Sequence, residues 1–210
     1  MLELAHGRNQ EALATLRPAV QLDELLAAPH PLARQAHALM LQAMLRLGET
    51  GRVEQALAEI DDEQRESPEI RKAIAALRLA QEDPEAATAV LAPVVASEPV
   101  PHPPWLVDAL LLEATARDAL GDAGAAERAL ERALALAEPD GARWPFLFNP
   151  VPTLLERHQR HHTAHASLVS EIITLLSGTG PMSAPGEPDR LIEPLSESET
   201  RILRYLPTNL

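Results

Sequence analysis

The 210-residue sequence predicts an all-α protein, built as an array of helical hairpins stacked on one another. Three observations lead to this fold class. Aromatic residues make up only 2% of the chain, and the apolar residues are dominated by alanine and leucine, which favour helices over sheets. Many apolar residues recur at the three- and four-residue spacing of a helix face. The prolines fall mostly between these helical stretches, where they end one helix or begin the next.

The N-terminal stretch, residues 1–20, is predicted to hold the end of one helix, a turn at Gly7 and a second helix from Asn9. Pro18 lies in the last turns of that second helix and should distort it. Because barely one helical turn precedes Gly7, we interpret the sequence as starting partway through a repeat.

The middle of the chain contains four further helical patterns, over residues 32–47, 53–63, 68–80 and 84–95. The first of them is strongly amphipathic. The last two begin in the same way, with a capping residue followed by a proline at the first helical position, Ser67-Pro68 and Asp83-Pro84. A rigid connector, PVPHPP at 99–104, separates them from the next pair.

The clearest hairpin follows this connector. A helix is predicted from Pro104 to Leu120, a turn at Gly121-Asp122 and a returning helix from Ala123 to Ala137. Small residues in both helices would let the two axes approach closely.

The hairpins are related by an irregular repeat. Aligning Ala12, Ala56, Ala87 and Ala126, at offsets of 44, 31 and 39 positions, also aligns Leu16, Ile60, Leu91 and Leu130. A helix–turn–helix unit of about 34 residues is the tetratricopeptide pattern. Residues 104–139 match it best, through Leu110, Ala114, Gly121, Ala126, Leu130, Ala133 and Pro139. Glu113 and Arg117 stand where the first helix usually carries aromatic residues, so the repeats are degenerate. The predicted architecture is therefore an α-solenoid of tetratricopeptide-like hairpins.

Three of the five aromatic residues cluster after the last hairpin, at Trp144, Phe146 and Phe148. We expect them to wedge between that hairpin and a helix that runs from Thr153 through Leu176. A functional binding patch is the alternative interpretation. The next stretch, 178–194, is rich in glycine and proline and has no apolar periodicity, which predicts a flexible linker.

Composition excludes several functions. The net charge is −13, which argues against strong binding of a phosphate backbone by this part of a protein. There is no cysteine, no phosphate-binding glycine motif and no recognisable catalytic set, so we expect neither an enzyme nor a cofactor. No segment is long and apolar enough to span a membrane, and no signal peptide is evident, so the cytoplasm is the expected compartment.

Four histidines are the only candidate metal ligands. His158 and His162, and likewise His161 and His165, are four positions apart, a spacing that can chelate a metal on one helix face. Two neighbouring arginines, Arg157 and Arg160, would repel a cation. The alternative is a polar helix start or a basic spot that faces DNA or a protein partner.

The last sixteen residues, 195–210, begin as a helix and stop before that helix has anything to pack on. Ser196 and Glu199 have the spacing of a capping box, and an apolar face follows at Ile202, Leu203 and Leu206. Pro207 then ends or bends the helix. Together with Leu195 and Asn209, these residues resemble the opening of the LuxR-type helix-turn-helix domain of bacterial transcription regulators.

A second resemblance lies in the block after the last hairpin. Its residues Arg143, Pro145, Phe146, Leu154 and Leu155 are similar to the end of the helical-repeat arm in large ATP-binding regulators of the LuxR type, the MalT-like kind. In that family the arm carries inducer or partner signals to a C-terminal DNA-binding domain. The resemblance divides the chain into a repeat arm at 1–177, a linker at 178–194 and the truncated start of a helix-turn-helix at 195–210.

The resemblance implies a signal-transmitting, protein-interaction arm of a transcription regulator, without the recognition helix. Its expected partners are another protein or other domains of the same regulator, and it would reach DNA only through residues that this sequence lacks. The alternative is a stand-alone helical-repeat scaffold that binds a protein partner.

Overall fold

The structure, a computed structural model, describes residues 8–23, 31–96, 104–160 and 163–178. All regular structure in these residues is helical, which confirms the predicted all-α class. The helices are α2 (Asn9–Asp23), α3 (Pro31–Arg46), α4 (Thr50–Ala58), α5 (Asp62–Arg65), α6 (Pro68–Ala80), α7 (Pro84–Val95), α8 (Pro104–Ala119), α9 (Ala123–Ala137), α10 (Trp144–Phe148), α11 (Pro152–Gln159) and α12 (Ala166–Leu176).

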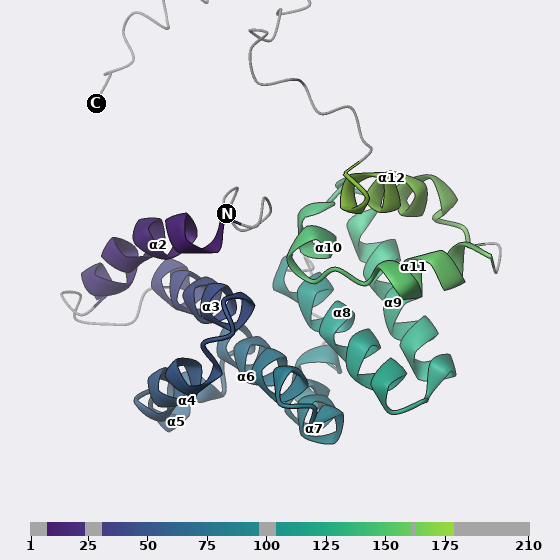
Figure 1. Cartoon of the computed structure of the whole chain (residues 1–210). Coiled ribbons are helices and arrows are strands. Elements are labelled where there is room, and N and C mark those ends of the chain that lie inside the picture. The colour runs from purple at the N-terminus through teal and green to yellow at the C-terminus, as the bar shows by residue number, and fades with distance from the viewer. Residues whose placement is uncertain (1–7, 24–30, 97–103, 161–162, 179–210) are drawn as a thin grey trace, which may run out of the picture.

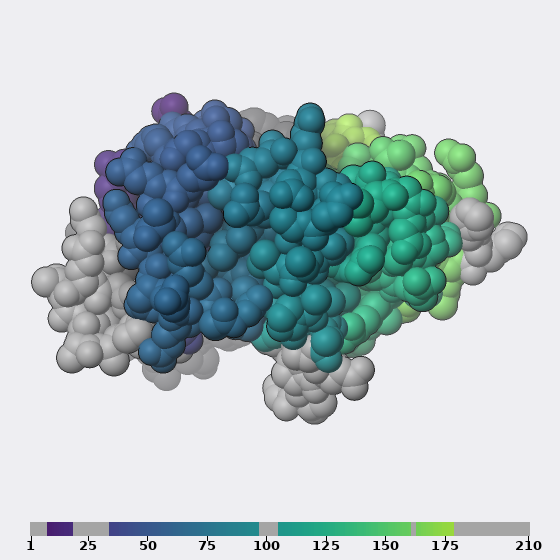
Figure 2. All heavy atoms as spheres, turned by 90° about the horizontal axis from the view of Figure 1, so that it is seen from below, coloured from purple at the N-terminus to yellow at the C-terminus, as the bar shows by residue number. Residues whose placement is uncertain are grey.

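Between Pro31 and Ala137, three pairs of consecutive helices form hairpins: α3 with α4, α6 with α7, and α8 with α9. The preceding helix, α2, packs on α3. The first helices of the pairs, α3, α6 and α8, pack on one another in that order, and α7 also packs on α8 (Figure 1). The chain therefore advances along the long axis of the molecule in sequence order, as the colours in Figure 2 show.

The three hairpin turns have the same geometry. Each contains one residue with a positive φ angle, namely Gly48 (76°), Glu82 (59°) and Gly121 (77°). The next amide in each turn donates to a carbonyl five residues back, with N–O distances of 2.9–3.0 Å at Glu49, Asp83 and Asp122. This is a Schellman C-cap, which favours glycine at the left-handed position. Glu82 follows Gly48 by 34 positions, and Gly121 follows Glu82 by 39.

The shared turn sets the register of the second helices. Counting from the positive-φ residue, Val53, Ala87 and Ala126 are equivalent, as are Leu57, Leu91 and Leu130, and all six side chains are buried. The predicted alignment of Ala56 and Ile60 with Ala87 and Leu91 is therefore three positions too far along the chain. The alignment of Ala87 with Ala126 is the one that the turns support.

The helix predicted over 53–63 is shorter and broken. α4 ends at Ala58, and a separate single turn, α5, begins at Asp62. The side chain of Asp61 caps this turn by accepting from the Gln64 amide at 2.7 Å. Arg65 donates back to the carbonyls of Leu57 at 2.7 Å and Ile60 at 3.0 Å, so it satisfies the end of α4.

The helix predicted from Thr153 through Leu176 is also two helices, α11 and α12. They pack on one another, and α11 also packs on α9. Their leucines, valine and isoleucine join the core of the α8–α9 hairpin, which makes this the largest buried cluster among the described residues. A mid-segment break lets both short helices turn an apolar face to the same hairpin.

The helix predicted from Asn9 is present as α2, which runs through Pro18 to Asp23. Gly7, most of the 99–104 connector, the linker beyond Gly178 and the whole of 195–210 lie outside the described residues. No helix in the described part of the chain has the length and apolarity to cross a membrane.

Candidate functional site

A short segment after the last hairpin lies against the first one. We call residues 144–149, which comprise α10 and Asn149, the clasp. Arg46 of α3 donates from Nη2 to the carbonyls of Leu147, at 3.0 Å, and Phe148. Gln42, one turn earlier on α3, donates from Nε2 to the Phe148 carbonyl at 3.2 Å. These side chains satisfy the carbonyls at the end of α10, and they do so across about a hundred residues of sequence.

The three aromatic residues of the clasp have three different surroundings. Phe146 is fully buried in the core of α8, α9, α11 and α12, which agrees with the predicted wedge. Phe148 turns instead to α2 and α3, where it packs on Ala12 and Ala43. Trp144 is 46% exposed, so for this side chain the wedge prediction is wrong. The clasp thus joins the C-terminal core to the N-terminal helices.

A chain of polar side chains continues from the clasp across the inner helices. Asn149 donates from Nδ2 to Asp108 Oδ1 of α8 at 2.9 Å, and accepts at Oδ1 from Gln42 at 3.2 Å. Lys72 of α6 donates to the other Asp108 oxygen at 3.0 Å. The Lys72 and Asp108 side chains are 16% and 20% exposed. One network therefore ties α3, α6, α8 and the clasp together.

Arg46 is held in this arrangement as a partly buried charge. Burial lowers the pKa of its guanidinium below the ordinary value. An arginine remains protonated even so, and its fork of donors suits carbonyl groups that no backbone amide satisfies.

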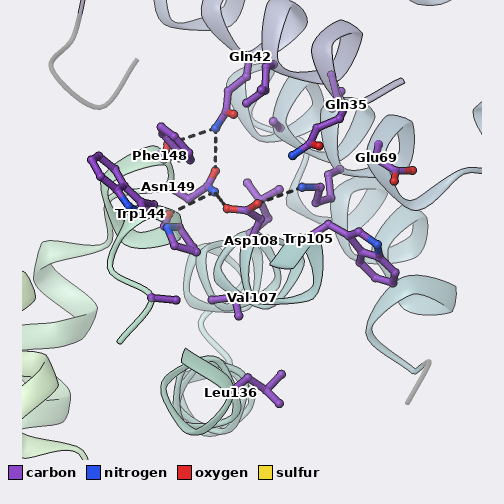
Figure 3. A pocket seen from close by; sticks show the side chains of 18 of the residues that line it. Gln35, Gln42, Glu69, Trp105, Val107, Asp108, Leu136, Trp144, Phe148 and Asn149 are labelled. Carbon is purple, nitrogen blue, oxygen red and sulfur yellow. Dashed lines mark hydrogen bonds and ion pairs between the residues drawn. The ribbon is translucent and has the colours of Figure 1, made fainter. Parts of the chain in front are cut away.

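A cavity of about 340 Å³ lies between the inner helices and the clasp. Figure 3 shows it with Gln42 on one side, Asp108 and Asn149 in the middle, and Trp144 and Trp105 on opposite flanks. Its apolar lining comes mainly from alanine, leucine, valine and the aromatic residues. Its polar lining consists of Gln35, Gln42, Glu69, Lys72, Asp108, Asp140 and Asn149. This size falls at the lower end of the range for small-ligand pockets.

The charges around the cavity are unequal. Of the described lining residues, three are carboxylates, Glu69, Asp108 and Asp140, and one is a cation, Lys72. Lys72 is paired with Asp108. Within the described part of the chain, Glu69 and Asp140 have no ion-pair partner. The pocket combines two indole rings with an excess of negative charge.

Two of the four predicted histidines lie in a second polar cluster, away from the cavity. His158 of α11 is 5% exposed, and its Nε2 is 2.5 Å from Glu131 Oε2 of α9. His165, which precedes α12, has Nδ1 at 2.6 Å from Glu138 Oε2 and Nε2 at 3.6 Å from Glu131 Oε1. Thr163 donates to Glu131 at 3.2 Å. The cluster attaches α11 and the start of α12 to α9.

The geometry does not reproduce the spacing on which the metal hypothesis depends. α11 ends at Gln159 and His165 is the N-cap of α12, so neither i, i+4 pair lies on one continuous described helix. His161 and His162 lie outside the described residues. Among the described residues no group of three or more histidine, cysteine or acidic side chains could hold a metal ion.

The polar residues of the cavity were not predicted from the sequence. One signal was available: Asp108 interrupts the apolar run of α8, and a charged residue in such a run must find a partner. The partners themselves come from three other segments, and no local spacing relates them. The start of the predicted helix-turn-helix, Leu195, Ser196, Glu199, Ile202, Leu203 and Leu206, lies outside the described residues.

Comparison with known proteins does not identify a family for this chain. No family model matches the chain, and neither a curated protein nor a solved structure matches it.

Proposed function

We propose that residues 1–177 belong to the signal-transmitting, protein-interaction arm of a LuxR-type transcription regulator, and that the arm is a solenoid of tetratricopeptide-like hairpins. The repeated turn supports the solenoid, because Gly48 and Glu82 are separated by the 34 positions of that repeat. The stacking of α3, α6 and α8 supports it too, since each unit of a solenoid buries its apolar face on its neighbours.

The observation that carries the interaction function is the position of the cavity. Its lining comes from α3, α6 and α8, the end of α9, and the clasp, so an occupant would contact residues from Gln35 to Asn149 at once. In a structure whose other contacts are mostly between neighbouring units, an occupant of this cavity would contact all three inner helices and the clasp together.

Transmission follows from the connections of the clasp. Phe146 is embedded in the core that holds α11 and α12, and α12 leads directly to the predicted linker at Gly178. An occupant that displaces or tightens the clasp would change the packing of α12, the helix to which the predicted linker and residues 195–210 are attached. In this proposal those residues begin the helix-turn-helix, and DNA is read by a helix that follows them.

The test is DNA binding by the protein encoded in the complete reading frame around this sequence. We expect the frame to continue into a recognition helix, and the product to shift duplex DNA in a sequence-specific and salt-dependent way. The chain 1–210 alone, with a net charge of −13, should not bind duplex DNA specifically.

A Trp144→Ala substitution in the complete protein should alter regulated transcription without changing the DNA sequence that is recognised, because Trp144 is half exposed beside the cavity. A frame that ends at Leu210, with no specific DNA binding, would favour the stand-alone scaffold instead.

A further inference from the structure

The cavity between the inner helices and the clasp has a chemical preference that the proposed function leaves open. We propose that it binds an organic cation, a guanidinium or ammonium group on an apolar body. The inference deepens the proposed function, since it names the class of ligand for the same site.

The first argument is charge. The one lysine in the lining is already paired, with Nζ 3.0 Å from Asp108. The carboxylates of Glu69 and Asp140 remain without a partner among the described residues. An anionic ligand would be repelled by both carboxylates, whereas a cation would be attracted to them.

The second argument is the aromatic lining. The chain has two tryptophans, and both line this cavity. Indole is the side chain that attracts cations most strongly through its ring face. In Figure 3 Trp105 lies on the same side as Glu69, and Trp144 lies on the opposite side. No hydrogen bond of either indole is formed within the described part of the chain, so neither ring is committed to a polar role in the fold.

The third argument is the apolar wall. Leu39, Leu112 and Leu136, with several alanines, provide a surface on which the aliphatic part of such a ligand could pack. Gln42 donates to the Asn149 side chain and to the Phe148 carbonyl of the clasp, and Asp108 bonds to Lys72 and Asn149. The polar groups in the middle of the cavity are thus mutually satisfied, which leaves recognition to its charged and aromatic flanks.

Butylguanidinium and butylurea form a matched pair of probes, since they have nearly the same shape and only the first is charged. A ¹⁵N-labelled chain gives two indole N–H signals, one from each tryptophan, and Trp105→Phe and Trp144→Phe identify them. We expect butylguanidinium to shift both signals saturably, with an affinity at least about tenfold higher than that of butylurea. The binding should weaken as salt is raised.

Glu69→Gln and Asp140→Asn should each weaken butylguanidinium binding by about two- to fivefold, the range expected for an ion pair at the protein surface. Glu59→Gln is the control, because Glu59 is exposed at the end of α4 and does not line the cavity. It should leave the affinity unchanged. Equal shifts with both probes, or shifts that never saturate, would overturn the proposal, as would a loss in Glu59→Gln equal to that in Glu69→Gln.

The same chemistry could come from a free cation or from a basic side chain of a polypeptide. A blocked Gly-Arg-Gly peptide and its citrulline analogue separate the two sources. Tighter binding of the arginine peptide than of butylguanidinium assigns the site to a protein segment, and weaker binding assigns it to a small cation. The regulator proposal is tested separately by DNA binding, so cation binding without DNA binding would contradict that proposal alone.

Discussion

The hairpin array at 31–137 and the C-terminal segment at 144–176 are both helical, but different contacts hold them in place. In the array, each helix packs on a neighbour in the chain or in the next hairpin, and each turn repeats the same cap. In the C-terminal segment, short helices without a repeat are fixed by distant partners in the array, such as Arg46 to Leu147 and Asp108 to Asn149. Periodic units can stack by local rules, whereas a clasp depends on the whole array being assembled.

The largest difference should be seen at Phe146. Replacing it with alanine removes a fully buried ring from the core that joins the last hairpin to α11 and α12. We expect Phe146→Ala to lower the free energy of unfolding by about 3–5 kcal/mol, measured by urea denaturation. Trp144→Ala, two positions away and 46% exposed, is the control and should cost about 1 kcal/mol or less. A similar loss of unfolding free energy in both variants would mean that Phe146 does not anchor α10 in the core.

Arg46→Ala should loosen the contact between the clasp and α3 while leaving the hairpins folded. The substitution leaves the carbonyls at the end of α10 without their charged donor, which we expect to cost about 2 kcal/mol. Hydrogen exchange should accelerate at the Asn149 amide, which donates to Pro145, and not in α6 or α7. Arg52→Ala removes only an exposed pair with Glu49 and should change stability by about 0.5 kcal/mol. Uniform acceleration across the array would contradict a local clasp.

The hairpin turns offer a comparison within the array. Gly121→Ala places a side chain at φ 77° and should cost about 1 kcal/mol, whereas Glu82→Gly relieves the same strain and should stabilise by about 0.5–1 kcal/mol. Gly51→Ala is the control, since Gly51 lies in α4 and a β-carbon there would meet nothing. It should stabilise by about 0.5–1 kcal/mol because alanine is the better helix former. Thermal unfolding of each variant would show whether the substitution stabilises or destabilises the protein.

Effects of similar size are expected at the residue that follows the positive-φ position of each turn. Asp83 and Asp122 cap the next helix by accepting from Ala86 and Ala125, each at 3.0 Å, while the equivalent Glu49 makes no such bond. Asp83→Ala and Asp122→Ala should each cost about 1 kcal/mol, and Glu49→Ala about 0.5 kcal/mol or less. Equal losses at all three positions would show that the cap is not what distinguishes these turns.

Much of the array could be predicted from local patterns. The bounds of α3, α6, α7 and α9 lie within about one residue of the prediction, because proline, glycine and capping residues mark helix ends in the sequence itself. The breaks after α4 and α11 were missed. Apolar periodicity continues across both, and a break depends on partners elsewhere, such as Arg65 for the end of α4.

The candidate site was outside the reach of such patterns. Its residues come from segments that are 36 to 107 positions apart, and the amides Gln42 and Asn149 carry no spacing that singles them out. The histidines, which do have a suggestive spacing, lie in a different cluster with the glutamates of α9.

By itself the sequence determined that the chain is helical, where most helices begin and which stretches pair as hairpins, because these depend on the residues within a few turns of one another. Only the tertiary structure decided the register of the repeats, the position of the clasp on α3 and the partners of Asp108. Those depend on which buried side chains and unsatisfied polar groups meet when the hairpins stack, and that meeting is set by packing in space rather than by spacing along the chain.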